Sequence, residues 1–274
     1  MKFLCDLRAL CGKKAVACCK YQLIGGSIGY VLALLAVMAT APLKGVLLDI
    51  DGTLLDSNDA HAAAFTRAFA EHGLDIPFDH VRPLVGMGSD KLIPSLTGFA
   101  DDTREGKAIV ERKKGIFEQR YLPDLKPTPG ARALLERLLS DGLILVVATS
   151  AGGDEMKGLL EQAGVDDLIH GATSSGDVDK SKPDPDVIGA AIKKSKLKAG
   201  QLLMLGDTPY DIEAAAKAGL RTIALRCGGW WDDDALADAI AIYDDPADLR
   251  AHWPVVPLAG RGAKVPKGRK TAKR

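Results

Sequence analysis

The fold follows from residues 43–57, LKGVLLDIDGTLLDS. The apolar run at 46–48 predicts a strand buried in a parallel sheet, and two acids, Asp49 and Asp51, come at its carboxyl end. Side chains two positions apart on a strand point the same way, so both acids can face one crevice. In open α/β sheets, ligands bind at this edge. Two like charges this close cost free energy unless a cation or a shared proton relieves them, so the pair indicates a functional site.

The alternation of strand and helix continues after residue 127. Apolar runs predict further buried strands at 143–148, near 168–172, and at 202–205, 221–225 and 240–243. Helices are expected at 128–139, 154–163, 212–218, 232–240 and 246–252. This order of elements is typical of an α/β fold with a parallel sheet.

Residues 58–126 interrupt that alternation with helical sequence alone. Helices are expected at 61–72, near 91–96 and at 101–122, with a flexible turn at 86–90. About seventy residues are too many for a loop, so we interpret them as a small helical cap domain that closes over the strand ends and excludes water. The core domain then consists of residues 42–57 and 127–258.

The first motif resembles that of the haloacid dehalogenase-like (HAD) hydrolase superfamily. Within that superfamily, it is most similar to the group of phosphoglycolate phosphatases and sugar-phosphate phosphatases and phosphomutases. Three later segments resemble the remaining motifs in the expected order: a strand that ends in Thr149-Ser150, then Lys182-Pro183, then Gly206-Asp207 with Asp211. The resemblance covers residues 43–253. It implies a three-layer, doubly wound parallel sheet of the Rossmann-like HAD type, with an inserted helical cap.

The resemblance also implies catalytic roles. Asp49 would attack phosphorus and form an aspartyl-phosphate. Asp51 would protonate the leaving oxygen and then deprotonate the hydrolytic water. Thr149, Ser150 and Lys182 would bind the phosphate, and Lys182 would neutralise charge on the phosphate and on nearby carboxylates.

Magnesium is the implied cofactor. Its protein ligands would be Asp49, the main-chain carbonyl of Asp51, and Asp207, because hard divalent cations prefer oxygen. Asp211 is expected to stay outside the coordination sphere and to orient water or Lys182.

These assignments predict a magnesium-dependent phosphomonoester hydrolase that acts on a small phosphorylated metabolite. Asp51 separates branches of the resembling family, because the dehalogenases lack an acid there and the transport ATPases have Thr. One alternative is a sugar phosphomutase, which returns the phosphoryl group to its substrate. A second alternative is a catalytically idle binding or regulatory protein on the same fold, which the presence of all the motif residues disfavours.

The cap of the resembling family contributes substrate selectivity. The candidates for polar or close-approach contacts are Arg82, Gly86, Ser89 and Lys91, and each could instead be an ordinary cap-surface residue. His61 lies at the start of the first cap helix, as does a histidine in the sugar-phosphate mutases, and a role in capping or packing is the alternative. Phosphoglycolate or a small sugar phosphate is the substrate class that the resemblance suggests.

Charge and cysteine content limit the choice of partners. The chain has 36 basic and 36 acidic residues, yet residues 42–260 carry eleven more acids than bases, so we expect no nucleic acid to bind this body. Residues 259–274 hold seven bases and no acid, which predicts a disordered basic tail, with a polyanion contact as the alternative. Cys227 is the one cysteine of this body, so the fold is not a disulfide scaffold. The oligomeric state stays open.

Residues 1–41 form a hydrophobic N-terminal extension. Residues 23–41 carry no charge and follow a basic stretch. Such a segment suits a membrane helix of marginal length, or a signal peptide ending at Ala41, although Pro42 disfavours that cleavage. The preferred interpretation is that Met38 is the true start and that the protein is cytoplasmic. An anchor through residues 23–41, with membrane contact, is the second.

Overall fold

The structure is a computed structural model that describes residues 42–253. The predictions for the N-terminal extension and the basic tail lie outside the described residues, as do residues 254–258 of the predicted core. Within residues 42–253, no helix is both long and apolar enough to cross a lipid bilayer.

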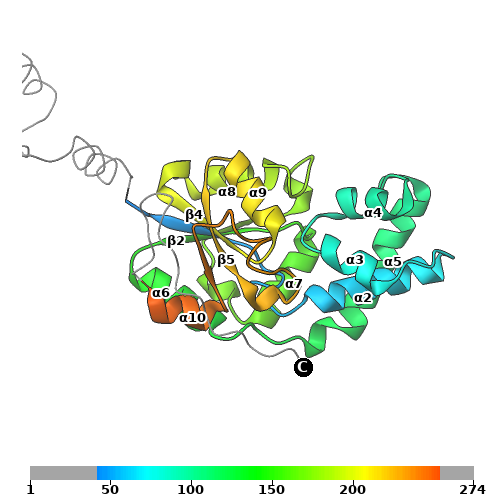
Figure 1. The fold of residues 1–274 in the computed structure, drawn as a ribbon, viewed down its shortest axis with the longest axis horizontal. Coiled ribbons are helices and arrows are strands. Elements are labelled where there is room, and N and C mark those ends of the chain that lie inside the picture. Colours follow the sequence, from blue (N-terminus) through cyan, green and yellow to red (C-terminus); the bar gives the residue numbers. More distant parts are fainter. Residues whose placement is uncertain (1–41, 254–274) are drawn as a thin grey trace, which may run out of the picture. The chain divides into compact units, whose positions relative to one another are not determined.

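Six parallel strands form one sheet at the centre of the core (Figure 1). The strands are β1 (Gly45–Leu48), β2 (Ile144–Ala148), β3 (Gly171–Thr173), β4 (Leu202–Gly206), β5 (Arg221–Leu225) and β6 (Ala241–Tyr243). Their order is β3-β2-β1-β4-β5-β6, so the chain runs outward from β1 first on one side and then on the other. The prediction of a doubly wound parallel sheet is confirmed.

Helices cover both faces of the sheet and make three layers (Figure 1). One face carries α6 (Ala131–Ser140), α7 (Gly153–Ala163) and α10 (Pro246–His252), and the other carries α8 (Asp186–Ser195) and α9 (Pro209–Lys217). Successive strand residues serve opposite layers, since Leu48 packs in the first core and Leu47 in the second. Burial of these apolar side chains on both faces fixes the strands and therefore the positions at which they end.

The insertion between β1 and β2 is helical throughout. It contains α2 (Asn58–Glu71), α3 (Phe78–Val81), α4 (Ser89–Thr97) and α5 (Arg104–Arg120), together with the 3₁₀ turns η3 (Arg82–Leu84) and η4 (Leu122–Asp124). Figure 1 shows these helices gathered beyond one end of the sheet. Helices α2 and α5 pack against each other, with Phe65, Phe69 and Phe117 buried.

Short 3₁₀ turns join elements of the core: η5 (Asp166–Leu168), η6 (Ser175–Asp177), η7 (Ala199–Gln201) and η8 (Arg226–Gly228). The predicted strand near 168–172 is displaced, because η5 occupies its beginning and β3 starts at Gly171. Helices α3 and α8 have no counterpart among the predicted helices.

One predicted helix is wrong. Residues 232–240 form turns, not a helix. The side chain of Asp232 accepts a hydrogen bond from the backbone N–H of Ala235 (3.0 Å), and Asp233 pairs with Arg226 (2.6 Å). Aspartate side chains that bond to backbone groups or to a distant arginine compete with a regular helix, and this segment begins with three of them in a row.

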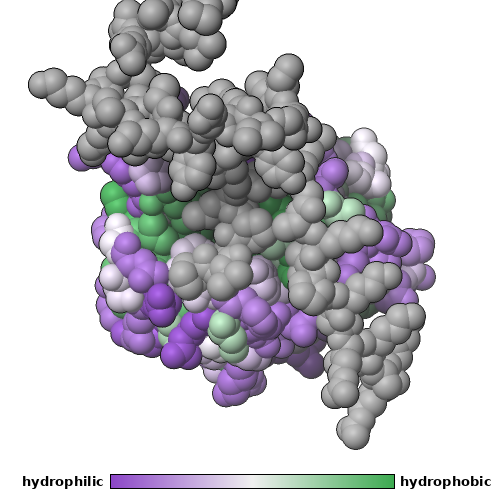
Figure 2. Space-filling view, turned by 60° about the vertical axis from the view of Figure 1, so that its left-hand side comes forward, coloured by the Kyte–Doolittle hydropathy of each residue, from purple (hydrophilic) through white to green (hydrophobic). Residues whose placement is uncertain are grey.

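The described surface is largely polar. Figure 2 shows one face, on which hydrophilic residues cover most of the lower half of the described part. Among residues 42–253, Trp230 is the large hydrophobic side chain that is exposed, at 40%. The guanidinium of Arg82 lies 5.7 Å from the centre of its ring, in the range of a cation–π contact.

Candidate active site

Three neighbouring strands end at one crevice. Leu48 of β1 pairs in register with Val147 of β2 and with Leu205 of β4. Asp49 follows β1 directly, and its backbone N–H donates to the carbonyl of Leu205 (2.9 Å). Thr149 follows β2, and Asp207 follows β4, so both reach the same edge. This edge is where the strand order reverses, the usual ligand site of such sheets.

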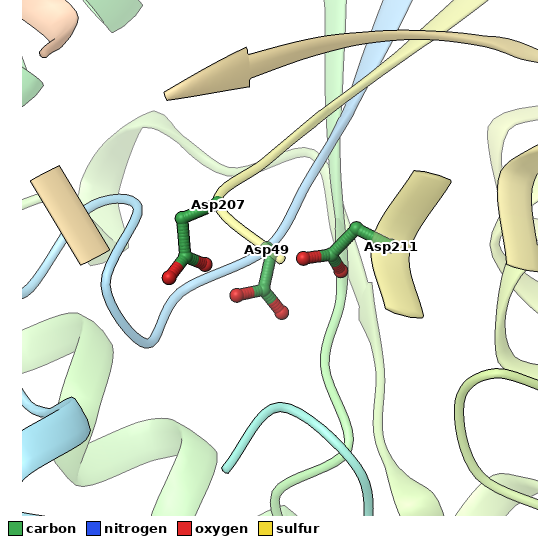
Figure 3. A group of neighbouring side chains, drawn as sticks. All are labelled: Asp49, Asp207 and Asp211. Carbon is green, nitrogen blue, oxygen red and sulfur yellow. The ribbon is translucent and has the colours of Figure 1, made fainter. Parts of the chain in front are cut away.

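Asp49, Asp207 and Asp211 form one acidic cluster. Each offers a carboxylate oxygen that lies within 4.8 Å of the others, and all three side chains are buried. Figure 3 shows their carboxylates gathered at the ends of β1 and β4 and the start of α9. The ammonium of Lys182 contacts Asp49 Oδ1 at 2.5 Å and Asp211 Oδ1 at 2.7 Å. The structure therefore brings together four residues from three segments that are far apart in the sequence.

The pKa values of this cluster reflect an excess of negative charge. Burial raises the pKa of Asp49 well above its usual value, and Asp211 and Asp207 add to this effect against Lys182. Burial and the charge of Asp211 raise the pKa of Asp207 to about 8. Burial disfavours the charged form of Lys182, but Asp211 and Asp49 outweigh this and raise its pKa.

A hard divalent cation fits this cluster. When all three carboxylates are ionised, the one ammonium leaves an excess of two negative charges. The donors are carboxylate oxygens, which magnesium and other hard cations prefer. Asp49 and Asp207 are thus suited to bind such an ion.

Asp211 is held differently from its two neighbours. Its Oδ1 accepts from Lys182, and its Oδ2 accepts from the backbone N–H (3.1 Å) and hydroxyl (2.7 Å) of Thr208. Its contact with the Lys182 ammonium suits the predicted role of orienting Lys182.

Asp207 is also fixed by polar neighbours. Thr53 donates to its Oδ1 (3.2 Å), and Asn58 donates to its Oδ2 (2.8 Å). A Cβ atom at Gly52 or Gly228 would collide with the carboxylate, so these positions need glycine. Asn58 was not among the predicted site residues, although it directly follows the first motif.

Asp51 has a separate set of partners. Ser57 Oγ donates to its Oδ1 (2.5 Å), and His61 Nε2 lies 2.8 Å from the same oxygen. Burial alone would raise the pKa of Asp51, but His61 and Ser57 outweigh it and lower the value. Ser57 precedes α2 as its N-cap residue without capping it through its side chain. The hydroxyl thus serves the site rather than the helix end.

The contacts continue beyond His61. Its ring stacks on Phe117 (3.9 Å between centroids), and its Nδ1 lies 3.6 Å from Glu155 Oε1. Lys113 Nζ binds the same Glu155 oxygen at 2.6 Å. Neither Glu155 nor Lys113 was predicted. Lys113 had a signal in the sequence, because it precedes Ile116 and Phe117 by three and four residues and therefore lies on the same side of α5. Glu155 had none, since an acid in the first turn of a helix is ordinary.

A cavity of about 280 Å³ joins these groups. Predicted site residues line it: Asp49, Asp51, His61, Gly86, Ser89, Thr149 and Ser150. Its apolar wall includes Phe65, Val85 and Leu92 of the insertion, and Lys113 and Glu155 reach it as well. The cavity is thus bounded by both the core and the inserted helices.

The two residues of the second motif differ in their contacts. Thr149 Oγ1 accepts from the backbone N–H of Ala151 (3.0 Å), which leaves its hydroxyl hydrogen to be donated. Ser150 Oγ donates to the carbonyl of Gly86 (3.3 Å) and so joins the core to the insertion.

Two predicted cap residues do not line the cavity. Arg82 is buried, donates through Nε to Asp59 (2.5 Å), and through Nη2 to the carbonyl of Gly228. Lys91 forms an ion pair with Asp184 (2.8 Å). Both residues link the insertion to its surroundings, and neither is placed to touch a ligand in the cavity.

Comparisons with known proteins identify the family of the chain. The model of the family described as haloacid dehalogenase-like hydrolase matches residues 46–225. The phosphoglycolate phosphatase of Rhodospirillum rubrum is 31% identical over 228 residues, which cover 79% of this chain and 93% of that protein. The N-acetylmuramic acid 6-phosphate phosphatase of Pseudomonas aeruginosa is 28% identical and covers 77% of this chain and 88% of its own.

A solved structure shows the same architecture. The crystal structure of a hydrolase from Pseudomonas syringae superposes with a TM-score of 0.72 at 28% identity, and covers 78% of this chain and 99% of its own. The chain therefore belongs to the haloacid dehalogenase-like hydrolases, in their phosphatase group.

Proposed function

We propose that the protein is a magnesium-dependent phosphomonoester hydrolase that works through an aspartyl-phosphate on Asp49. One observation carries the proposal: Lys182 holds Asp49 within the same carboxylate cluster as Asp207, while Asp51 faces the same cavity. Small phosphate esters are the proposed substrates, because the relatives are named for phosphoglycolate and N-acetylmuramic acid 6-phosphate. A cavity of about 280 Å³ suits such ligands.

Asp49 is the proposed nucleophile. One of its oxygens is held by Lys182, which leaves the other to attack phosphorus from the cavity side. The same ammonium, with the hydroxyl of Thr149, can donate to the oxygens of the transferring group. Attack forms a bond between Asp49 and phosphorus and breaks the bond from phosphorus to the ester oxygen.

Asp51 is the proposed acid and base. It gives a proton to the departing ester oxygen and later takes one from the water that hydrolyses the aspartyl-phosphate. A bound phosphate dianion adds negative charge beside Asp51 and favours its protonated form. Ser57 and His61 hold its carboxylate in place during both steps.

Magnesium would be held by Asp49, Asp207 and the main-chain carbonyl of Asp51. When bound, it would neutralise charge on the transferring phosphoryl group and orient it for in-line attack. Asp211 would keep Lys182 directed at Asp49.

A phosphomutase is the second candidate, favoured by the contact of His61 with Asp51 (2.8 Å). A screen of phosphorylated metabolites, including phosphoglycolate and hexose phosphates, separates the candidates. Release of inorganic phosphate at the rate of substrate loss supports the hydrolase. Conversion of a sugar phosphate to its isomer without release supports the mutase. If neither reaction occurs with any ester, the remaining interpretation is a catalytically idle binding protein.

The proposed location is the cytoplasm, with Met38 as the first residue, and an anchor through residues 23–41 is the alternative. N-terminal sequencing of the native protein distinguishes these two proposals.

A further inference from the structure

Glu155 reaches from the core into the insertion. It lies in the first turn of α7, and its Oε1 binds Lys113 of α5 at 2.6 Å and approaches His61 Nδ1 of α2 at 3.6 Å. The side chains of Glu155 and Lys113 are only 11% and 9% exposed. One carboxylate oxygen thus meets Lys113 and His61, which come from two different helices of the insertion.

The charge of Glu155 is maintained in this position. Burial disfavours the ionised form, but the charges of Lys113 and His61 outweigh burial and hold the pKa of Glu155 below its usual value. Lys113 is further enclosed by the rings of Phe65 (5.2 Å) and Phe117 (5.0 Å). Separating a buried pair of this kind leaves an uncompensated charge, so the pair favours the closed arrangement of α5 on α7.

His61 connects this pair to Asp51. The imidazole stacks on Phe117 on one flat side, lies 2.8 Å from Asp51 at Nε2, and lies 3.6 Å from Glu155 at Nδ1, within ion-pair distance. A ring fixed at these three places cannot rotate without losing a polar contact. The orientation of the ring therefore depends on Glu155, and the position of the Asp51 carboxylate depends on the ring.

We propose that Glu155 is a positioning residue for the acid–base step: it holds His61 against Asp51, and its ion pair with Lys113 makes this support available only when α5 lies against α7. The inference rests on the proposed function, since it assumes that Asp51 exchanges protons with the ester. It assigns an active-site task to a residue outside the four motifs.

The leaving group provides a specific test. The alkoxide that departs from an alkyl phosphate is a strong base, so its oxygen needs a proton as it leaves. The p-nitrophenolate that departs from p-nitrophenyl phosphate is a weak base and leaves without one. Glu155→Gln keeps the shape of the side chain and removes its charge. The kcat/KM of this variant should fall by roughly tenfold for the best alkyl phosphate of the screen, which is less than the effect of removing a general acid altogether. For p-nitrophenyl phosphate it should fall by less than about threefold. The ratio kcat/KM is used because it excludes the later hydrolysis of the aspartyl-phosphate.

Two comparisons make the test specific. Glu161→Gln changes an exposed acid of the same helix, which pairs with Lys157, and should leave both esters unaffected. In a His61→Gln background, Glu155→Gln should add less than about a twofold loss for either ester, because residues that act through one another are not additive.

The outcomes separate this inference from the proposed function. The proposed function is tested by itself through turnover of the wild-type protein, which Asp49→Asn should abolish. Given that turnover, equal losses on both esters, no loss on either, or full additivity with His61→Gln would overturn the role of Glu155. If Glu155→Gln fails to fold, Lys113→Met tests the same link from the insertion, with the same dependence on the leaving group expected and equal losses again contradicting it.

Discussion

Asp49 and Asp51 lie two residues apart, yet their surroundings are opposite in charge. Burial raises the pKa of Asp49, and the nearby Asp211 and Asp207 add to this effect, with Lys182 alone opposing it in that cluster. Asp51 faces His61 and Ser57, with Lys113 beyond, so its pKa is lowered. Because side chains at i and i+2 share one side, a single strand end supplies both environments to one cavity. The comparison supports the proposal that a cation binds beside Asp49, whereas Asp51 already has the ammonium of Lys113 nearby.

The largest effect is expected from substitution of Asp49, the proposed nucleophile. Asp49→Asn should lower turnover of any phosphate ester by roughly 10³-fold or more, because the amide cannot form the phosphoryl-enzyme. Folding should be unharmed, since the change removes one of three crowded carboxylates while Lys182 keeps Asp211. Steady-state kinetics and a thermal melt measure both, with the exposed Asp238→Asn as control. Activity near that of the wild type would exclude Asp49 as nucleophile.

Chelation tests the proposed magnesium site at Asp49 and Asp207. Exhaustive chelation should abolish turnover, and Mg²⁺ should restore it. In the absence of substrate, Mg²⁺ at a hundred times its Kd should stabilise the protein by about 2.7 kcal/mol, measured as a rise in the melting temperature. Asp207→Asn should lose this rise. Full turnover after chelation, or an equal rise in Asp207→Asn, would contradict the magnesium site.

The acid–base side predicts a smaller and more selective loss. Asp51→Asn should reduce kcat/KM for alkyl phosphates by about 10²-fold, as for loss of a general acid, and should affect p-nitrophenyl phosphate much less. The comparison of the two esters is the measurement. Equal losses would mean that Asp51 serves a purpose other than proton transfer.

The smallest effect concerns stability and pH. The pKa of Asp207 is raised to about 8 in the metal-free fold. Between the ordinary value near 4 and that value the folded protein binds more protons than the unfolded chain, so stability falls as pH rises through this window. The melting temperature in chelator should drop by about 2–5 °C from pH 6 to pH 8. Asp207→Asn should show a smaller drop, and an identical pH profile in both would contradict this origin.

The core site could be predicted because each strand fixes the position of the residue that follows it. Asp49, Thr149 and Asp207 each follow an apolar run, and a parallel sheet brings such ends to one edge without further information. Lys182 and Asp211 were found through the resemblance of their motifs. The catalytic, phosphate-binding and metal-binding roles of these five residues stay proposals.

The insertion was less predictable because its contacts depend on how helices dock. Arg82 and Lys91 were proposed as ligand contacts from residue type alone, yet docking places them against Gly228 and Asp184. Glu155 looks like a surface charge in the sequence, and the spacing of Lys113 from Ile116 and Phe117 says nothing of its partner. The two become a buried pair where α5 meets α7. The helix expected at 232–240 failed for a related reason, since Asp233 finds a distant arginine.

The phosphoryl-enzyme tests the central claim most directly. A single turnover of wild-type protein with Mg²⁺ and its best ester, quenched in acid and digested, should yield a peptide that contains Asp49 and carries one phosphoryl group on that residue. Reduction with borohydride should then mark that same position. A phosphoryl group on any other residue, or rapid turnover without a trapped phosphoryl-enzyme, would contradict attack by Asp49.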